Sequence, residues 1–222
     1  MQIPRYLVDF DSNALPRVRT EVIVIGAGIA GLFTAIQSGE TREVMMITKK
    51  SVMDSNTRYA QGGIAAVFAD DDSPKFHRQD TMIAGAGLCD ASAVEVLVTE
   101  GPNGVRDLIR YGTQFDLETD GEYALTKEGA HSHRRILHAH GDATGAEIVR
   151  ALWEEAKANP RITMWDDHFV IDLLTNGDEC WGVLVQKPDG SRVIVEADAT
   201  ILCSGGAGQL YRYTTNPDIA TG

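Results

Sequence analysis

The glycines between residues 26 and 31 have the type and spacing of a phosphate-binding turn. The segment matches G-x-G-x-x-G, directly after an apolar run and at the start of a stretch with one apolar face. In such a turn the first glycine permits the bend, the second lets a pyrophosphate approach the backbone, and the third lets helix and strand pack closely. The helix start adds free N–H groups and a partial positive charge. We therefore expect a dinucleotide site, with a purely structural glycine turn as the alternative. The expected contacts are Gly26, Ala27, Gly28, Ile29, Ala30 and Gly31.

A second cluster combines histidines with arginines. His131, His133, His138 and His140 lie on either side of Arg134-Arg135. Imidazole is a common metal ligand, but no cysteine or carboxylate spacing completes a site here, and two arginines would repel a cation. We therefore expect no metal. The cluster is better suited to line a pocket for an anionic ligand, with a basic surface patch as the alternative. The residues expected to line the pocket are His131, His133, Arg134 and Arg135.

The nucleotide-binding pattern lacks one of its usual residues. An acid normally holds the ribose hydroxyls about twenty residues after the glycine turn. Here the corresponding stretch reads Thr48-Lys49-Lys50. This departure argues against plain NAD binding and favours a relative that contacts the ribose differently.

These residues need a frame to position them, and the first part of the chain predicts one. The β-branched run 22–25 is typical of a strand covered on both faces in a parallel sheet. A helix follows from Ile29 to about Gly39, and a second strand is expected over 44–47. Strand, helix and strand form a βαβ unit with a right-handed crossover.

The middle of the chain predicts loops and two helices. Residues 48–88 are polar and rich in glycine, so we expect long functional loops there, including an acidic tip at 70–72. A helix is expected from the N-cap Asp90 to Ile109, interrupted near Gly101-Pro102. Another should begin at Thr144, which forms a capping box with Glu147.

The last part predicts β-structure. Short apolar runs at 169–174, 181–186 and 193–195 are separated by turn residues, which indicates an antiparallel meander. A buried-type strand over 200–203 then leads into Gly205-Gly206, where backbone should approach a partner closely. The expected fold is α/β, a Rossmann-like domain with a parallel sheet plus the meander. We expect a leader over 1–19 and one domain over 20–222.

Composition excludes several classes of partner. The 222 residues carry a formal net charge of -12, and no basic block stands out, so we expect no nucleic acid and no membrane surface as partners. The start of the chain lacks the continuous apolar stretch of a signal peptide or membrane span. The three cysteines show no CxxC spacing, which suits a reducing, cytoplasmic location.

The segment 56–66, Asn-Thr-Arg-Tyr-Ala-Gln-Gly-Gly-Ile-Ala-Ala, resembles the flavin loop of the succinate dehydrogenase, fumarate reductase and L-aspartate oxidase superfamily. The resemblance implies FAD as the cofactor, with this loop beneath the isoalloxazine ring. It also makes Lys49 a cofactor contact in place of the missing acid. Asn56 stands where succinate dehydrogenases carry the histidine that links to FAD, so the flavin should be non-covalent. The further cofactor contacts that the resemblance implies are Asn56, Thr57, Arg58, Tyr59, Ala60, Gln61, Gly62, Gly63, Val170, Gly205 and Gly206.

The segment 125–139, Leu-Thr-Lys-Glu-Gly-Ala-His-Ser-His-Arg-Arg-Ile-Leu-His-Ala, is similar to L-aspartate oxidases in particular, and the residues 142–145 and 214–218 extend the match. In that family Glu128 faces the α-amino group of the substrate. A carboxylate at this position can pair with the ammonium that distinguishes aspartate from succinate. The alternative is that Glu128 is a solvated loop charge beside Lys127.

The resemblance implies oxidation of L-aspartate to iminoaspartate, with dioxygen or fumarate as electron acceptor. This is the first step of NAD biosynthesis through quinolinate, and quinolinate synthase would consume the product. The family supplies its proton-transferring arginine from a capping domain and later segments, which we expect beyond Gly222, so this chain alone should be inactive. Two alternatives remain: a succinate or fumarate oxidoreductase flavoprotein, and a non-catalytic dinucleotide-binding module.

Overall fold

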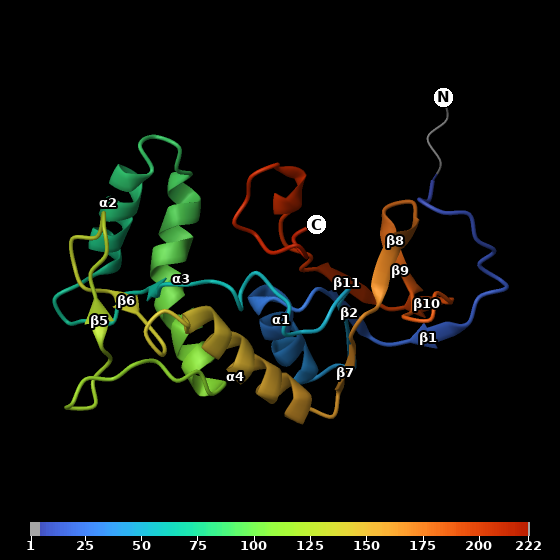
Figure 1. Cartoon of the computed structure of the whole chain (residues 1–222), viewed down its shortest axis with the longest axis horizontal. Coiled ribbons are helices and arrows are strands. Elements are labelled where there is room, and N and C mark those ends of the chain that lie inside the picture. The colour runs from blue at the N-terminus through green and yellow to red at the C-terminus, as the bar shows by residue number, and fades with distance from the viewer. Residues whose placement is uncertain (1–4, 222) are drawn as a thin grey trace. The chain divides into compact units, whose positions relative to one another are not determined.

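The computed structural model describes residues 5–221 (Figure 1). The chain divides into two compact units. The first combines the chain up to Thr57 with the chain from Leu152 onward, and the second comprises Arg58–Ala151. Helix α4 (Thr144–Ala158) contains the boundary between them.

The first unit is built on the predicted parallel sheet. Its order is β11-β2-β3-β7, and every neighbouring pair is parallel. The strands β2 (Val22–Ile25) and β3 (Val44–Ile47) are buried at every residue and are joined by α1 (Ile29–Gly39), which confirms the βαβ unit. The remaining strands are β7 (Ile162–Trp165) and β11 (Ala199–Leu202). The strand expected over 200–203 is present, but β11 is an edge strand and is not fully buried.

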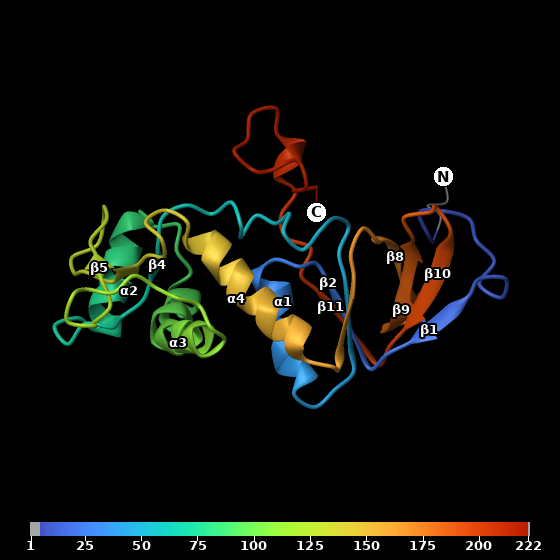
Figure 2. The ribbon, with the colours of Figure 1, turned by 60° about the horizontal axis from the view of Figure 1, so that its bottom comes forward.

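The second sheet of this unit contains the predicted meander. The meander contributes three of its four strands, β8 (Phe169–Asn176), β9 (Glu179–Gln186) and β10 (Arg192–Glu196), paired antiparallel in the order β10-β9-β8 (Figure 2). Side chains of β9 and β10 pack against alternate residues of β2 and β3 in one hydrophobic cluster. Alternate residues of a strand point to the same face, so this cluster joins the meander to one face of the parallel sheet.

The segment expected to be a leader also contributes structure. Residues Arg17–Arg19 form β1, which pairs parallel with β10. Four apolar residues before it pack partly buried against Leu174, Leu184 and Ile194; they are Tyr6, Val8, Phe10 and Leu15. The domain boundary at residues 19 and 20 stays a prediction.

The second unit contains a small antiparallel sheet and two helices. The sheet has the order β4-β6-β5, made of β4 (Ile64–Ala65), β6 (Ile136–Leu137) and β5 (Leu125–Thr126). The helix α2 (Pro74–Ala84) lies where only loops were expected, so that prediction was wrong. Ser73 caps the helix by accepting a hydrogen bond from Phe76 N. Only His77 is buried along α2. The sequence therefore shows no apolar periodicity from which this helix could be predicted.

Helix α3 (Ala91–Arg110) is continuous, so the interruption expected near Gly101-Pro102 was wrong. Its N-cap is Asp90 as predicted, with the side chain accepting from the amides of Ser92 and Ala93. Pro102 is tolerated because a single buried stripe runs past it on both sides. The stripe consists of Val94, Val98, Val105 and Leu108.

Helix α4 begins at Thr144 as predicted, but the two capping-box side chains bind elsewhere. The hydroxyl of Thr144 accepts from Ala139 N at 3.1 Å. The carboxylate of Glu147 accepts from Gln114 N and from Arg150. The Ala143 carbonyl accepts from Glu147 N. The first helical hydrogen bond therefore starts at Ala143, one residue before the N-cap position that a capping box would give to Thr144.

Candidate functional site

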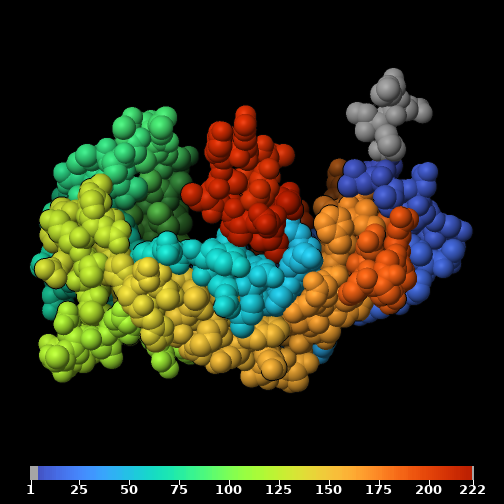
Figure 3. All heavy atoms as spheres, in the orientation of Figure 1, coloured from blue at the N-terminus to red at the C-terminus, as the bar shows by residue number. Residues whose placement is uncertain are grey.

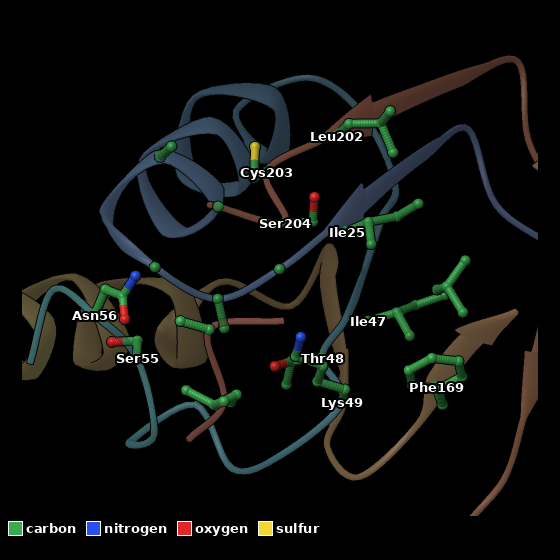
Figure 4. Close-up of a pocket in the computed structure, with 18 of the residues that line it drawn as sticks. Ile25, Ile47, Thr48, Lys49, Ser55, Asn56, Phe169, Leu202, Cys203 and Ser204 are labelled. Carbon is green, nitrogen blue, oxygen red and sulfur yellow. The ribbon is translucent and has the colours of Figure 1, made fainter. Parts of the chain in front are cut away.

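A cavity of about 500 Å³ opens at the carboxyl ends of the parallel strands in the first unit (Figure 4). Open α/β sheets bind ligands at this edge, and ligand pockets usually measure about 300–1,000 Å³. The wall comes from six stretches of chain: 25–30, 47–49, 54–57, 168–173, 202–206 and 219–220. Side chains of Lys49, Asn56 and Ser204 come to it from three different stretches.

Most of the predicted cofactor contacts of this unit meet at the cavity. The predicted contacts that line it are Gly26, Ala27, Gly28, Ile29, Ala30, Lys49, Asn56, Thr57, Val170, Gly205 and Gly206. They come from four distant parts of the chain, so the fold brings together what the sequence separates. The binding role of each of these residues stays a prediction.

Two of the three motif glycines are required by the protein itself. Gly26 has a φ of +107°, and a Cβ there would lie 2.2 Å from the Cys203 carbonyl oxygen. A Cβ on Gly31 would lie 1.9 Å from the Gly26 carbonyl oxygen. These contacts confirm the steric reasons expected for a tight turn and for close packing of helix on strand. They also explain why Gly31 supports the cavity without lining it.

Gly28 is different, because no such crowding surrounds it. Among residues 5–221, the nearest atom to a Cβ at Gly28 would be Thr57 Oγ1 at 3.5 Å, an ordinary contact. Gly28 is the N-cap of α1, and the Thr57 hydroxyl accepts from Ile29 N at 3.0 Å. The first turn of α1 carries no acidic side chain. The positive end of the helix dipole therefore faces the cavity wall without a carboxylate of its own, which suits an anion.

Lys49 supplies a cation at the same cavity, at the end of β3 where the acid is missing. Its ammonium donates a hydrogen bond to the Thr221 hydroxyl. Burial lowers the pKa of the Lys49 ammonium from its ordinary value, because a low-dielectric setting disfavours the charged form. An anionic group nearby would stabilise the charge that burial penalises.

The C-terminal segment of the first unit carries the residues that extended the family resemblance. It stands out from the surface and ends in the short helix η1 (Gly208–Leu210) and the chain after it (Figure 3). The amide of Gln209 donates to the carbonyls of Asn216 and Pro217, and Gln209 N donates to Ala220 O. These bonds close the segment into a loop whose end, Ala220, lines the cavity.

The predicted flavin loop, residues 56–66, is divided between the units: Asn56 and Thr57 belong to the first, and the part from Arg58 onward belongs to the second. Gly62 has a φ of +78°, a conformation that favours glycine. A Cβ on Gly63 would lie 2.3 Å from Ile136 Cγ2 and 2.5 Å from the Leu137 carbonyl oxygen. The loop therefore leads directly into β4, packed tightly on β6. The remaining predicted contacts in it are Arg58, Tyr59, Ala60 and Gln61, and their role stays a prediction.

Glu128 lies in the connection between β5 and β6. Its side chain is 53% exposed, and Oε1 lies 3.5 Å from His138 Nε2. His138 was counted among the histidines but not among the expected site residues. Its proximity to Glu128 could not be read from a separation of ten residues in the sequence.

The two arginines of the cluster have opposite environments. Arg134 is exposed and makes one long hydrogen bond, to the Leu125 carbonyl at 3.5 Å. Arg135 is fully buried and binds Asp72 through Nε and Nη2, at 2.7 and 2.8 Å. Its Nη1 donates to Asp80 Oδ2 at 2.6 Å. The expected lining role of Arg135 stays a prediction, but its guanidinium is committed to two carboxylates within the second unit.

Asp72 and Asp80 bind Arg135 as carboxylates. Desolvation raises the pKa of each, but hydrogen bonds and the charge of Arg135 outweigh it, so that the pKa of Asp72 is lowered and that of Asp80 falls to about 2. Ser132 adds to the Asp80 site, donating from N and from Oγ at 2.8 Å each. The acidic tip expected at 70–72 is therefore partly wrong, because the Asp72 side chain has no exposed surface.

The other histidines are held by protein partners. His131 Nδ1 lies 3.1 Å from Arg135 Nη1, and His133 stacks on Phe76 with ring centroids 4.7 Å apart. His140 Nε2 lies 3.7 Å from Glu147. Within residues 5–221, no three histidine, cysteine or acidic side chains gather as metal ligands would. The helices of that same range include none with the length and apolar character needed to span a membrane.

Comparison with known proteins places this geometry in a family. A model of the FAD binding domain family matches residues 21–222. L-aspartate oxidase 2-a of Nicotiana tabacum is 48% identical over 204 residues, which cover 90% of this chain and 32% of that protein. The L-aspartate oxidase of Streptomyces coelicolor is 46% identical over 213 residues, covering 92% of this chain and 36% of that protein.

Comparison with solved structures shows a similar fold in a related flavoprotein. A quinol-fumarate reductase bound to menaquinol superposes with a TM-score of 0.87 at 32% identity, covering 94% of this chain and 37% of that one. The chain spans about a third of the length of the curated relatives it matches.

Proposed function

This chain belongs to the family of FAD binding domains, and we propose that it is the FAD-binding part of an enzyme that oxidises L-aspartate to iminoaspartate. The observation that carries the proposal is the meeting of the predicted cofactor residues at one cavity, beside a helix start that suits a pyrophosphate. The similarity to two L-aspartate oxidases supports the substrate. FAD is the cofactor of this family.

The residues at the cavity fit the phosphate portion of FAD. Within residues 5–221, no protein atom lies closer than 3.5 Å to a Cβ built on Gly28, which leaves space beside its backbone. A pyrophosphate there would meet the amides at the start of α1, and Lys49 would contact the cofactor in place of the acid that usually holds the ribose. Gly205 and Gly206 would let backbone approach the cofactor, because a Cβ on either would meet no atom of the described chain within 4 Å. Asn56 offers no imidazole for a covalent link, so we infer that FAD is non-covalent.

The substrate would be recognised by charge. When bound, FAD accepts the hydride that leaves the α-carbon of aspartate, while the amine loses a proton to a base. Glu128 would pair with the substrate ammonium, and its 53% exposure leaves the carboxylate available to a ligand. Succinate lacks the ammonium, so the same carboxylate would disfavour it. His131, His133 and Arg134 are proposed to compensate the two substrate carboxylates.

A flavin titration tests the cofactor site. The chain mixed with FAD should show the shifted visible spectrum of a bound flavin. Gly28→Ala should keep the fold, because the new methyl meets only Thr57 Oγ1 at 3.5 Å among described atoms and the backbone there is extended. It should nevertheless weaken FAD by about tenfold or more, since a methyl displaces the pyrophosphate from the amides. Gly104→Ala in α3 is the matched control and should leave the affinity unchanged. Equal affinities of the two variants would contradict the proposed site.

A second experiment tests the substrate. The full-length, FAD-loaded protein should lose its flavin colour when L-aspartate is added without oxygen, and succinate should leave it unchanged. Bleaching by succinate alone would indicate a succinate or fumarate oxidoreductase instead. A colourless protein that binds NAD would indicate a non-catalytic dinucleotide module.

The wider role follows from the same proposal. The electron acceptor would be dioxygen or fumarate, and the unstable imine would pass to quinolinate synthase in the first step of NAD biosynthesis. We expect the 222-residue chain alone to turn over aspartate poorly, because it spans about a third of the length of the L-aspartate oxidases it matches. Turnover by the isolated chain equal to that of the full-length protein would refute this. The three cysteines are free thiols, which suits the reducing, cytoplasmic location proposed for the enzyme.

A further inference from the structure

His138 is held at both edges of its ring. Nδ1 lies 3.1 Å from the Gly141 carbonyl oxygen, and Nε2 lies 2.8 Å from the Thr126 hydroxyl. A carbonyl oxygen only accepts hydrogen bonds, so Nδ1 carries a proton in this arrangement. Nε2 faces the Thr126 hydroxyl and the Glu128 carboxylate. A carboxylate also only accepts hydrogen bonds, so Nε2 attracts Glu128 when it carries a proton as well.

The ring also lies against the predicted flavin loop. A Cβ built on Gly63 would come within 3.0 Å of His138 Cε1. The imidazole side chain is 17% exposed, so its position is set by packing as well as by hydrogen bonds. Ring atom Cε1 thus lies close to backbone expected beneath the flavin, and the adjacent Nε2 meets the carboxylate expected to meet the substrate.

Glu128 needs such a neighbour. Its side chain is half exposed and lies on a connection between two short strands, so alone it would sample several rotamers. With a proton on Nε2, the 3.5 Å approach of His138 to Oε1 gives the carboxylate a donor on one side. The connection itself is fixed on its other flank, where Ser132 binds Asp80.

We propose that His138 is a positioning residue for substrate selection, which holds the Glu128 carboxylate at a set distance from the Gly62-Gly63 backbone so that it meets an ammonium group. The inference rests on the proposed function, since it presupposes that Glu128 reads the substrate amine. A residue that only supports the fold would affect all ligands alike. A residue that orients Glu128 affects only ligands that carry the ammonium.

Binding of two ligands to the full-length, FAD-loaded protein separates these roles. The flavin is first reduced with dithionite without oxygen, so that L-aspartate binds but is not consumed, and calorimetry gives the Kd of L-aspartate and of succinate. In His138→Phe the aspartate Kd should rise about five- to tenfold, while the succinate Kd changes less than twofold. His138→Gln should restore most of the aspartate affinity, because its amide can still donate to Glu128. His140→Gln is the matched control, an exposed histidine that faces Glu147, and should change neither Kd.

The outcomes distinguish this inference from the function beneath it. If Glu128→Gln leaves the ratio of the two Kd values unchanged, the proposed substrate recognition fails. If Glu128→Gln raises the ratio of the aspartate Kd to the succinate Kd and His138→Phe does not, only the role of His138 is overturned. Should His138→Phe not fold, Thr126→Val removes the hydroxyl that holds Nε2 and should raise the same ratio by a smaller factor. An unchanged ratio in that variant would also overturn the proposal.

Discussion

Replacing Arg135 by Met should open the second unit locally, even though no ligand is proposed to depend on that guanidinium alone. Arg135 has no exposed surface and neutralises two carboxylates, Asp72 with 0% and Asp80 with 12% of the side chain exposed. Met fills a similar volume but carries no charge. The variant therefore leaves two carboxylates without their cation in a site largely closed to water.

The size of the effect follows from this geometry. Removing one partner of a buried ion pair costs about 3–5 kcal/mol, because the other charge stays buried without compensation. Arg135 makes three short hydrogen bonds to the two carboxylates, so we expect a value within this range. Since about 1.4 kcal/mol corresponds to a factor of ten, local opening should become at least about 10²-fold more frequent.

Native-state hydrogen exchange measures this opening at the affected strands. The informative amides are those of Ala66, which donates to the Arg135 carbonyl, and of Arg135 itself, which donates to the Thr126 carbonyl. Arg134→Met is the matched control, because the neighbouring arginine is exposed and makes one long hydrogen bond. Its exchange should stay within about twofold of the original protein. Equal exchange in the two variants would refute the assignment of Arg135 as the buried charge that holds this unit together.

Three further predictions concern stability. Gly31→Ala should prevent stable folding of the first unit, because its Cβ would lie 1.9 Å from the Gly26 carbonyl oxygen. In the control Gly101→Ala in α3 the Cβ meets no described atom within 4 Å, so the melting temperature should stay equal or rise. Equal melting temperatures of the two variants would contradict the steric argument. Asp90→Ala should cost about 1 kcal/mol in urea unfolding through loss of the α3 cap, and a loss below about 0.2 kcal/mol would mean that the cap is dispensable. The folded-state pKa values of Asp72 and Asp80 are lowered, that of Asp80 from 3.8 to about 2. The stability that these carboxylates contribute is therefore complete above about pH 4 and disappears as the pH falls towards 2. Urea unfolding measured between pH 4 and pH 2 should show this loss in the original protein but not in Arg135→Met.

The sequence predicted the first unit well because its signals are local. The runs 22–25 and 44–47 became buried parallel strands, and the helix between them ended at Gly39 as expected. The turn residues near Gly177 and Gly190 marked a meander that the structure confirms. In each of these segments periodicity, propensity and burial agree, so the pattern alone was sufficient.

The second unit was harder to predict because its determinants are contacts between distant residues. Helix α2 buries only His77, so no apolar stripe marked it. The tip at 70–72 looked solvated, but Arg135 lies 63 residues further along and removes Asp72 from water. The proximity of His138 to Glu128 likewise depends on the pairing of β5 with β6. Charge composition cannot reveal which opposite charges will meet.

The glycines show how structure can separate folding requirements from ligand requirements within one motif. Gly26, Gly31 and Gly63 are explained by protein atoms that a Cβ would strike, so their presence would be expected even without a cofactor. Gly28 and Gly206 have neither a close protein neighbour within the described chain nor a positive φ, yet both line the cavity. A residue type that gains nothing for the fold, and costs conformational entropy, is best explained by something that binds beside it. Alanine at Gly206 should therefore leave the fold intact and appear only in the affinity for FAD, as at Gly28.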